Sequence, residues 1–166
     1  MTPDVIIGIG NILLRDEGVG VHVAQAMQAM DLPDHVEVVD GGTSGADLVD
    51  VLADRRRVVV VDAVRGDAKP GTVVLFPAED LLPEDAVAVS LHQLGLVDSL
   101  LMTRQLGCYP QEVRVVGIYP VDISPGLELS EVVARVVPKV IDFILSQFAE
   151  SAEIEQIPVA SAHGRG

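Results

Sequence analysis

The sequence predicts a three-layer α/β/α fold, in which a twisted, mostly parallel sheet of about five strands lies between two layers of helices. Short segments rich in β-branched residues alternate with segments of helical periodicity along the 166 residues, which is typical of parallel α/β domains. Residues 58–61 are four consecutive valines, as expected of a strand buried on both faces. No internal repeat or low-complexity tract indicates a different architecture.

The same patterns assign the individual elements. Strands are predicted at residues 5–9, 36–39, 58–61, 72–76 and 113–118. Helices are predicted at residues 19–30, 46–52, 91–106 and 130–148. Ser90 and Gln93 form a capping box, which sets the start of the third helix just before His92. Pro138 should kink the last helix or remove one of its hydrogen bonds.

The chain is predicted to form a single α/β domain over residues 1–150, followed by a flexible tail over residues 151–166, where the periodicity stops. Neither a signal peptide nor an apolar run long enough to cross a bilayer is found. The only cysteine, Cys108, excludes an internal disulfide and a multi-cysteine zinc site. These features indicate a cytoplasmic protein, and we expect a monomer.

The charge of the chain disfavours polyanionic partners. Lysine and arginine number 11 against 25 aspartates and glutamates, so the formal net charge is −14. Such a surface repels nucleic-acid phosphates and anionic lipids. We therefore expect no nucleic-acid partner and no membrane partner.

Polar side chains gather in the loops that follow the predicted strands. Right-handed crossovers bring these loops to the carboxyl edge of the sheet, where ligands of such folds bind. Glu17 lies in the loop after the first strand, Asp62 ends the third strand, and His92 lies in the first turn of a helix. We expect the three side chains to meet at this edge.

Two carboxylates and one imidazole suit a divalent transition metal and leave coordination positions open for water or substrate. His92 near a helix N-terminus should be neutral, which is the form that binds metals. Each residue also has a structural explanation: Asp62 as a turn cap, Glu17 as a first-turn acid and His92 as an exposed residue. Convergence at one edge favours the metal site.

The other histidines and the common nucleotide motifs give weaker signals. His22 and His35 are interpreted as solvated residues, and His163 lies in the tail. Leu13 stands where a dinucleotide-binding fingerprint needs its third glycine, and no P-loop is present. Residues 42–46 lack the last glycine of a nucleophile elbow.

A receiver domain of a response regulator is the main alternative fold assignment. It would use Asp16 and Glu17 as its acidic pair and Asp62 as the phosphate acceptor. That domain also needs a lysine after its last strand, where this chain has Tyr119, Pro120 and Val121. The acidic pair further lies about seven residues beyond the first strand, too late for that pattern. The receiver interpretation is therefore disfavoured.

The chain resembles the maturation endopeptidases of NiFe-hydrogenases over residues 4–148. The resemblance lies in Gly8-x-Gly10-Asn11-x-Leu13-x-x-Asp16-Glu17-Gly18-x-Gly20, Asp40-Gly41-Gly42-Thr43, Asp62-Ala63 and His92-Gln93-x-x-Leu96. It implies a phosphorylase/hydrolase-like α/β fold and a peptide hydrolase. Such enzymes remove a C-terminal extension from the precursor of the hydrogenase large subunit after nickel has been inserted.

The resemblance also implies roles for individual residues. Glu17, Asp62 and His92 would contact nickel supplied by the substrate, and zinc or cadmium could occupy the same position. Asp16 or Asp40 could act as a general base. Residues that would contact the peptide are Asn11, Gly41, Gly42 and Thr43. A non-catalytic metal-sensing or chaperone module that uses the same edge is the alternative from another functional class.

Overall fold

The computed structural model describes residues 3–43, 48–82 and 91–148, with the backbone alone for residues 91–94. This part of the chain forms one sheet in the strand order β2-β1-β3-β5-β4. Its strands are β1 (Asp4–Ile9), β2 (Val36–Gly42), β3 (Arg57–Ala63), β4 (Val73–Pro77) and β5 (Glu112–Ile118). The neighbours β2, β1, β3 and β5 are parallel, and β4 pairs antiparallel with β5. The predicted mostly parallel sheet is confirmed.

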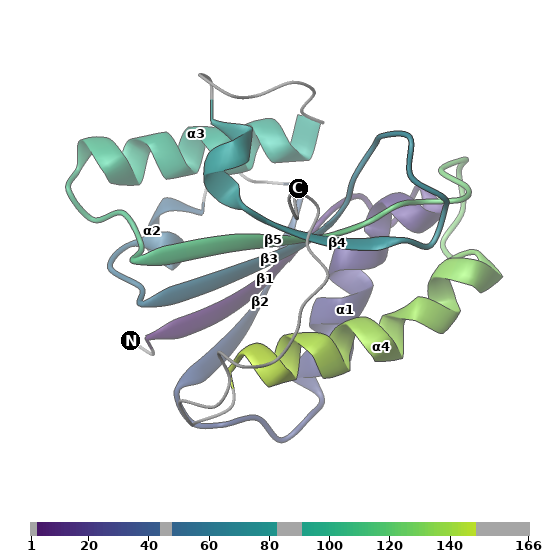
Figure 1. Ribbon diagram of the computed structural model, residues 1–166, viewed down its shortest axis with the longest axis horizontal. Helices are drawn as coiled ribbons and strands as arrows, with labels where there is room; N and C mark the ends of the chain where they lie inside the picture. The colour runs from purple at the N-terminus through teal and green to yellow at the C-terminus, as the bar shows by residue number, and fades with distance from the viewer. Residues whose placement is uncertain (1–2, 44–47, 83–90, 149–166) are drawn as a thin grey trace.

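Helices cover both faces of the sheet (Figure 1). Helices α1 (Val19–Gln28) and α4 (Glu131–Gln147) pack on one face. Helices α2 (Val49–Leu52) and α3 (Leu91–Gln105) pack on the other. The chain therefore has the three-layer α/β/α architecture that its sequence predicts.

Strand β3 divides the hydrophobic core between the two faces. Val59 and Val61 pack in the cluster with α1 and α4. Val58 and Val60 pack in the cluster with α2 and α3. All four side chains are buried, as the run of valines predicts. Because side chains alternate along a strand, Asp62 lies on the face covered by α3.

The extension of β2, the antiparallel direction of β4 and two single-turn helices were not predicted. Strand β2 continues through Asp40, Gly41 and Gly42, which the sequence pattern assigns to a loop. Pairing with β1 extends the strand: Gly8 pairs with Asp40, Ile9 pairs with Gly42, and Gly41 is the extra residue of a β-bulge. Two 3₁₀ helices, η1 (Arg15–Gly18) and η3 (Ala78–Leu81), also escape prediction because they are single turns.

The predicted helices are confirmed, with ends that differ by a few residues. Helix α4 begins after Ser130, whose hydroxyl accepts a hydrogen bond from the amide of Val133, and it continues through Pro138. Ser90 of the predicted capping box, residues 46–47 of the predicted second helix and the predicted tail lie outside the described residues. No helix in the described part of the chain is long and apolar enough to span a membrane.

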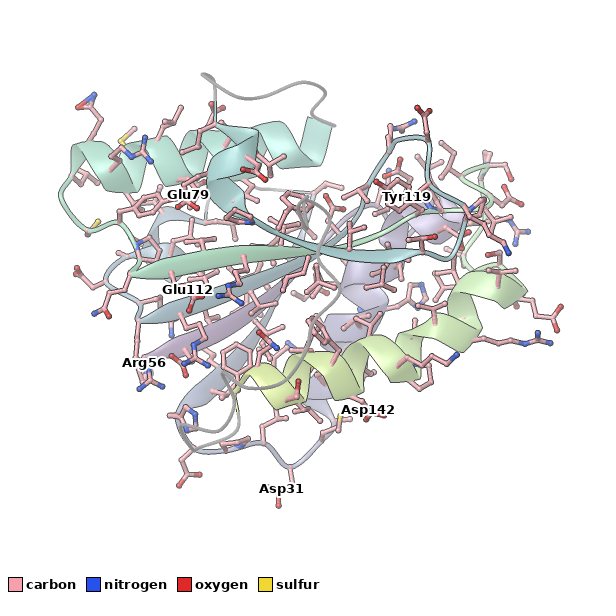
Figure 2. All side chains as sticks on the ribbon, in the orientation of Figure 1. Asp31, Arg56, Glu79, Glu112, Tyr119 and Asp142 are labelled. Atoms are coloured by element: carbon pink, nitrogen blue, oxygen red, sulfur yellow. The ribbon has the colours of Figure 1, made fainter. Side chains whose placement is uncertain are left out.

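Ion pairs concentrate at the amino edge of the sheet, opposite the expected site. Asp4 is fully buried there, and its carboxylate accepts hydrogen bonds of 3.0 and 2.6 Å from the Arg56 guanidinium. His35, interpreted from sequence as solvated, is half-buried with its Nε2 atom 3.6 Å from Asp4. Figure 2 shows Arg56 at this edge, near the start of β1. The amino edge is thus fixed by charge-assisted contacts.

Candidate functional site

The carboxyl edge is shaped by a close approach of α1 to the ends of β1 and β3. A Cβ atom on Gly20 would lie 2.1 Å from the carbonyl oxygen of Val61 and 2.5 Å from that of Ile9. Only glycine allows a helix to start so close to two strand ends. The helix start in turn holds η1, the turn that carries Glu17, beside β3.

Glu17 is buried at this edge and forms an ion pair with Arg65. Its side chain is 8% exposed, and Oε2 accepts a 2.8 Å hydrogen bond from Nη2 of Arg65. Its backbone is also fixed, because the Glu17 carbonyl accepts from the amide of Asn11 and the Glu17 amide donates to Leu14. Since Arg65 follows Asp62 by three residues, this ion pair brings Glu17 to the carboxyl end of β3.

Asp62 occupies the end of β3, directly opposite Gly117 of β5. The side chain is fully buried, and its Oδ1 atom accepts a 2.8 Å hydrogen bond from the amide of Ala63. This contact matches the turn-cap interpretation of Asp62. A buried carboxylate at the ligand-binding edge of a parallel sheet is a candidate for binding or catalysis.

His92 lies in the first turn of α3. Only the backbone is described here, so its side chain lies outside the described residues. Because α3 leads back to the start of β5, its own start lies toward the carboxyl edge (Figure 1). The helix covers the face on which Asp62 lies. The topology therefore brings the His92 backbone and Asp62 to the same side of the same edge.

The donor set at this edge fits a divalent cation in its chemistry. Glu17 and Asp62 supply two buried carboxylates, and the guanidinium of Arg65 already neutralises one of them. Carboxylate oxygens suit divalent ions, and an imidazole would complete the predicted set. Among the described side chains, no group of three or more histidine, cysteine or acidic residues is arranged to hold a metal. The third ligand thus stays a prediction for His92.

Asp16, the neighbour of Glu17, is a buried carboxylate that organises loops. Its two oxygens accept four hydrogen bonds: 2.9 Å from the Val121 amide, 3.0 Å from the Asp122 amide, and 2.8 Å each from the amide and hydroxyl of Ser130. The side chain is fully buried. This arrangement satisfies the carboxylate and ties η1 to the start of α4.

Asp40 is the more accessible of the two acids considered as a base. It lies on the exposed side of β2, where Oδ1 accepts a 2.9 Å hydrogen bond from the amide of Gly42 and Oδ2 a 3.3 Å bond from Gln25. The Gly41 bulge lies between these residues, and Gly42 has a φ of +51°, a conformation that glycine favours. The bulge re-aims the chain at the carboxyl edge.

The remaining predicted substrate residues frame the same edge. The side-chain oxygen of Asn11 accepts a 2.9 Å hydrogen bond from the amide of Leu13, and Thr43 is exposed just after β2. Leu13 and Leu127 are 61% and 64% exposed, and they lie on two loops joined by a bridge between Leu14 and Gly126. An exposed apolar surface therefore borders Glu17 and its loop.

The sequence analysis missed Arg65 as a partner of Glu17. The available signal was its position, three residues after Asp62, in a chain with only 11 basic residues. His22 was interpreted as solvated, but it is half-buried, and its Nε2 atom has no hydrogen-bond partner among the described residues. His22 lies on α1, which packs against the sheet and α4, and this position accounts for its burial.

Comparison with known proteins assigns the family. The family model described as HycI, hydrogenase maturation protease, matches residues 21–147. The chain is 34% identical to the hydrogenase 2 maturation protease of Escherichia coli over 160 residues, which cover 95% of this chain and 97% of that protein. The chain belongs to the hydrogenase maturation protease family.

Other relatives and solved structures of maturation proteases agree. The hydrogenase expression/formation protein HupD of Rhizobium leguminosarum bv. viciae is 36% identical over 141 residues, which cover 82% of this chain and 69% of that protein. The structure of the Escherichia coli hydrogenase maturating endopeptidase HybD matches with a TM-score of 0.78 and 35% identity, covering 87% and 90% of the two chains. The NiFe-hydrogenase maturation protease HybD of Thermococcus kodakarensis matches with a TM-score of 0.68 and 28% identity, covering 87% and 97%.

This membership makes the chain a peptide hydrolase. It confirms the resemblance inferred from the motifs around Glu17, Asp62 and His92. It also decides against the receiver-domain assignment and favours a maturation protease over a non-catalytic binding module. The individual roles of the site residues stay predictions.

Proposed function

We propose that this maturation protease removes the C-terminal extension of a NiFe-hydrogenase large-subunit precursor after nickel insertion. In this proposal Glu17, Asp62 and His92 contact the nickel of the precursor. The family assignment supports the class of reaction and the class of partner.

The observation that supports the proposal most directly is the ion pair between buried Glu17 and Arg65 at the carboxyl edge of the sheet. The carboxylate is 2.8 Å from the Arg65 guanidinium, so the position beside Glu17 favours positive charge. Asp62 adds a second buried carboxylate at the same edge. A nickel ion bound to thiolates of the precursor would find oxygen ligands here, and His92 is the predicted imidazole ligand.

Nickel then acts as a recognition element that belongs to the substrate. The protease has no need to bind a metal tightly on its own, since the precursor brings the ion. Affinity for the precursor depends on the nickel being present, and a precursor without it binds too weakly to be cut. Zinc or cadmium added alone would occupy the same ligands, because both accept carboxylate and imidazole donors.

Asp40 suits the role of general base better than Asp16. Hydrolysis needs a group that takes a proton from the attacking water and returns it to the departing amine. Asp40 is exposed at the edge and held by Gly42 and Gln25. Asp16 is fully buried and already accepts four hydrogen bonds from the loops that it joins, so its contacts are those of a structural residue.

A processing assay tests the proposal. Purified variants Glu17→Gln, Asp62→Asn and His92→Ala are mixed with nickel-loaded precursor, and the product is weighed by mass spectrometry. We expect loss of the C-terminal peptide with the wild type and less than about 1% of that rate with each variant, a loss typical of removing a group on which recognition of the transition state depends. Circular dichroism verifies that each variant is folded.

The matched control is Glu131→Gln. Glu131 also forms a 2.7 Å ion pair with an arginine, Arg135, but on the exposed surface of α4. This variant loses the same charge and should process the precursor at the wild-type rate. Normal cleavage by all three site variants would contradict the proposed roles. Nickel-dependent binding without cleavage by the wild type would favour a binding module instead.

A further inference from the structure

The loop after β3 carries a cation whose placement is fixed by the fold. The amide of Val64 donates to the carbonyl of Ile118, and the amide of Gly71 donates to that of Tyr119, so both ends of the loop are tied to β5 and its following residue. A Cβ atom on Gly66 would lie 3.1 Å from the ring of Tyr119, so the loop lies close against that ring. Arg65 is thus held next to the carboxyl edge by backbone contacts.

The two members of the Glu17–Arg65 pair differ in burial. The glutamate side chain is 8% exposed, whereas the arginine side chain is 60% exposed. A buried carboxylate needs a compensating charge or donors. The exposed arginine can leave into water at little cost, because its charge is readily hydrated there. The pair is therefore asymmetric: one partner is fixed and the other is exchangeable.

Building on the proposed function, we infer that Arg65 forms an ion pair with Glu17 in the free protease, and that the metal of the precursor displaces Arg65 from this carboxylate. The guanidinium of Arg65 neutralises the Glu17 carboxylate when no nickel-loaded precursor is bound. A divalent ion that approaches Glu17 must compete with this contact. A free ion in solution must displace Arg65 with its own binding energy only. Nickel held on the precursor also gains from the contacts that the precursor makes with the protease. Arg65 therefore acts as a specificity-determining residue against free metal ions.

Metal titration tests this inference without using activity. Cadmium ions are titrated by calorimetry into the wild type, Arg65→Ala and Glu17→Gln at low ionic strength. We expect Arg65→Ala to bind cadmium at the site about two- to fivefold more tightly, which corresponds to the usual strength of an ion pair at the protein surface. The difference should shrink as sodium chloride is added, since salt screens the competing charge.

The matched control is Arg135→Ala. It also removes one arginine from an ion pair, but Arg135 and its partner Glu131 are both exposed on α4. A general effect of making the protein more acidic would tighten cadmium binding in both arginine variants. A local effect appears in Arg65→Ala alone. Glu17→Gln identifies the heat that belongs to this site, because binding there should be lost in this variant.

A second readout is inhibition of precursor processing by free zinc. Half-inhibition of Arg65→Ala should occur at a several-fold lower zinc concentration than for the wild type or Arg135→Ala. Equal or weaker cadmium affinity in Arg65→Ala, with binding still dependent on Glu17, would overturn the role of Arg65 and leave the proposed metal contact intact. Cadmium affinity that is unchanged in Glu17→Gln would instead overturn the proposed metal contact, and the inference with it.

Discussion

The carboxylate of Asp16 holds Ser130 through both its backbone amide and its hydroxyl, each at 2.8 Å. The same hydroxyl accepts from the amide of Val133 at 3.3 Å and so caps α4. Residues 114 positions apart in the sequence are thereby joined in one hydrogen-bonded chain. The start of α4 depends on an acid from the first loop.

Replacing Asp16 should therefore reduce stability. Asp16→Asn loses a charged acceptor in a fully buried site that four donors surround, which costs about 2–4 kcal/mol of unfolding free energy. Ser130→Ala should cost less, about 1 kcal/mol, because it removes mainly the cap. Urea unfolding measures both. A normally stable Asp16→Asn protein without activity would instead indicate a chemical role for this acid.

Asp40 is expected to affect the rate of cleavage more than binding. If it is the base, Asp40→Asn should lower kcat by a factor of about 10² to 10⁴, with little change in affinity for the precursor. Single-turnover processing and a separate binding measurement distinguish the two effects. Asp31→Asn, an exposed acid just after α1, is the control. Full activity of Asp40→Asn would exclude it as the base.

The apolar border of the site should contribute to precursor binding. Leu127→Ser, or Leu13→Ser on the adjoining loop, removes exposed apolar surface beside η1, and KM for the precursor should rise about three- to tenfold. Leu106→Ser is a matched control, since Leu106 is 63% exposed but lies beyond the other end of α3. An equal effect of both changes would show that general hydrophobicity, not this surface, matters.

The close approach at Gly20 predicts a steric effect. Gly20→Ala would set a methyl group 2.1 Å from the carbonyl oxygen of Val61, so α1 must move, at a cost of about 2 kcal/mol or more. Gly107→Ala meets no atom within 4 Å and has only a φ of +75° to strain it, which costs about 1 kcal/mol. Thermal unfolding should rank the variants in this order. The reverse order would contradict the packing at the carboxyl edge.

Tyr109 should make stability depend on alkaline pH. Burial, and then the hydrogen bond to Glu79 and its negative charge, raise the pKa of this phenol above its usual value. A raised pKa in the folded state gives stability that is complete below about pH 10, where the unfolded phenol titrates. That stability is lost as the pH rises further. The stability advantage of the wild type over Tyr109→Phe should thus be constant up to about pH 10 and decrease from there to pH 11 in urea unfolding. An advantage that does not change would contradict the coupling.

The sequence predicted the sheet well because its strands are locally distinctive. The valines of β3 allow few other structures, and the alternation with helices requires parallel strands. The antiparallel direction of β4 was not predicted, because the direction of an edge strand depends on the path of the loop that leads to it, and the local sequence pattern does not reveal that path. The extension of β2 through Asp40 depends on pairing with β1, which no local pattern reveals.

The candidate site was predicted in its location but not in its contacts. The predicted topology brought Glu17 and Asp62 to one edge, where the structure has them. The expected convergence of the His92 side chain lies outside the described residues. The sequence analysis considered Asp16 as a base and did not predict its hydrogen bonds, because the donors around this carboxylate come from residues 121, 122 and 130. The pairing of Glu17 with Arg65 likewise depends on side-chain orientation in a loop, which periodicity does not encode.

The single turn η1 has a consequence for how the chain can vary. Its two acidic residues are adjacent, yet one anchors the start of α4 and the other contacts the edge loop after β3. Removing or inserting one residue in this turn would rotate both carboxylates away from their partners together. Changes of side chain in the first loop are therefore far easier to accommodate than changes of its length.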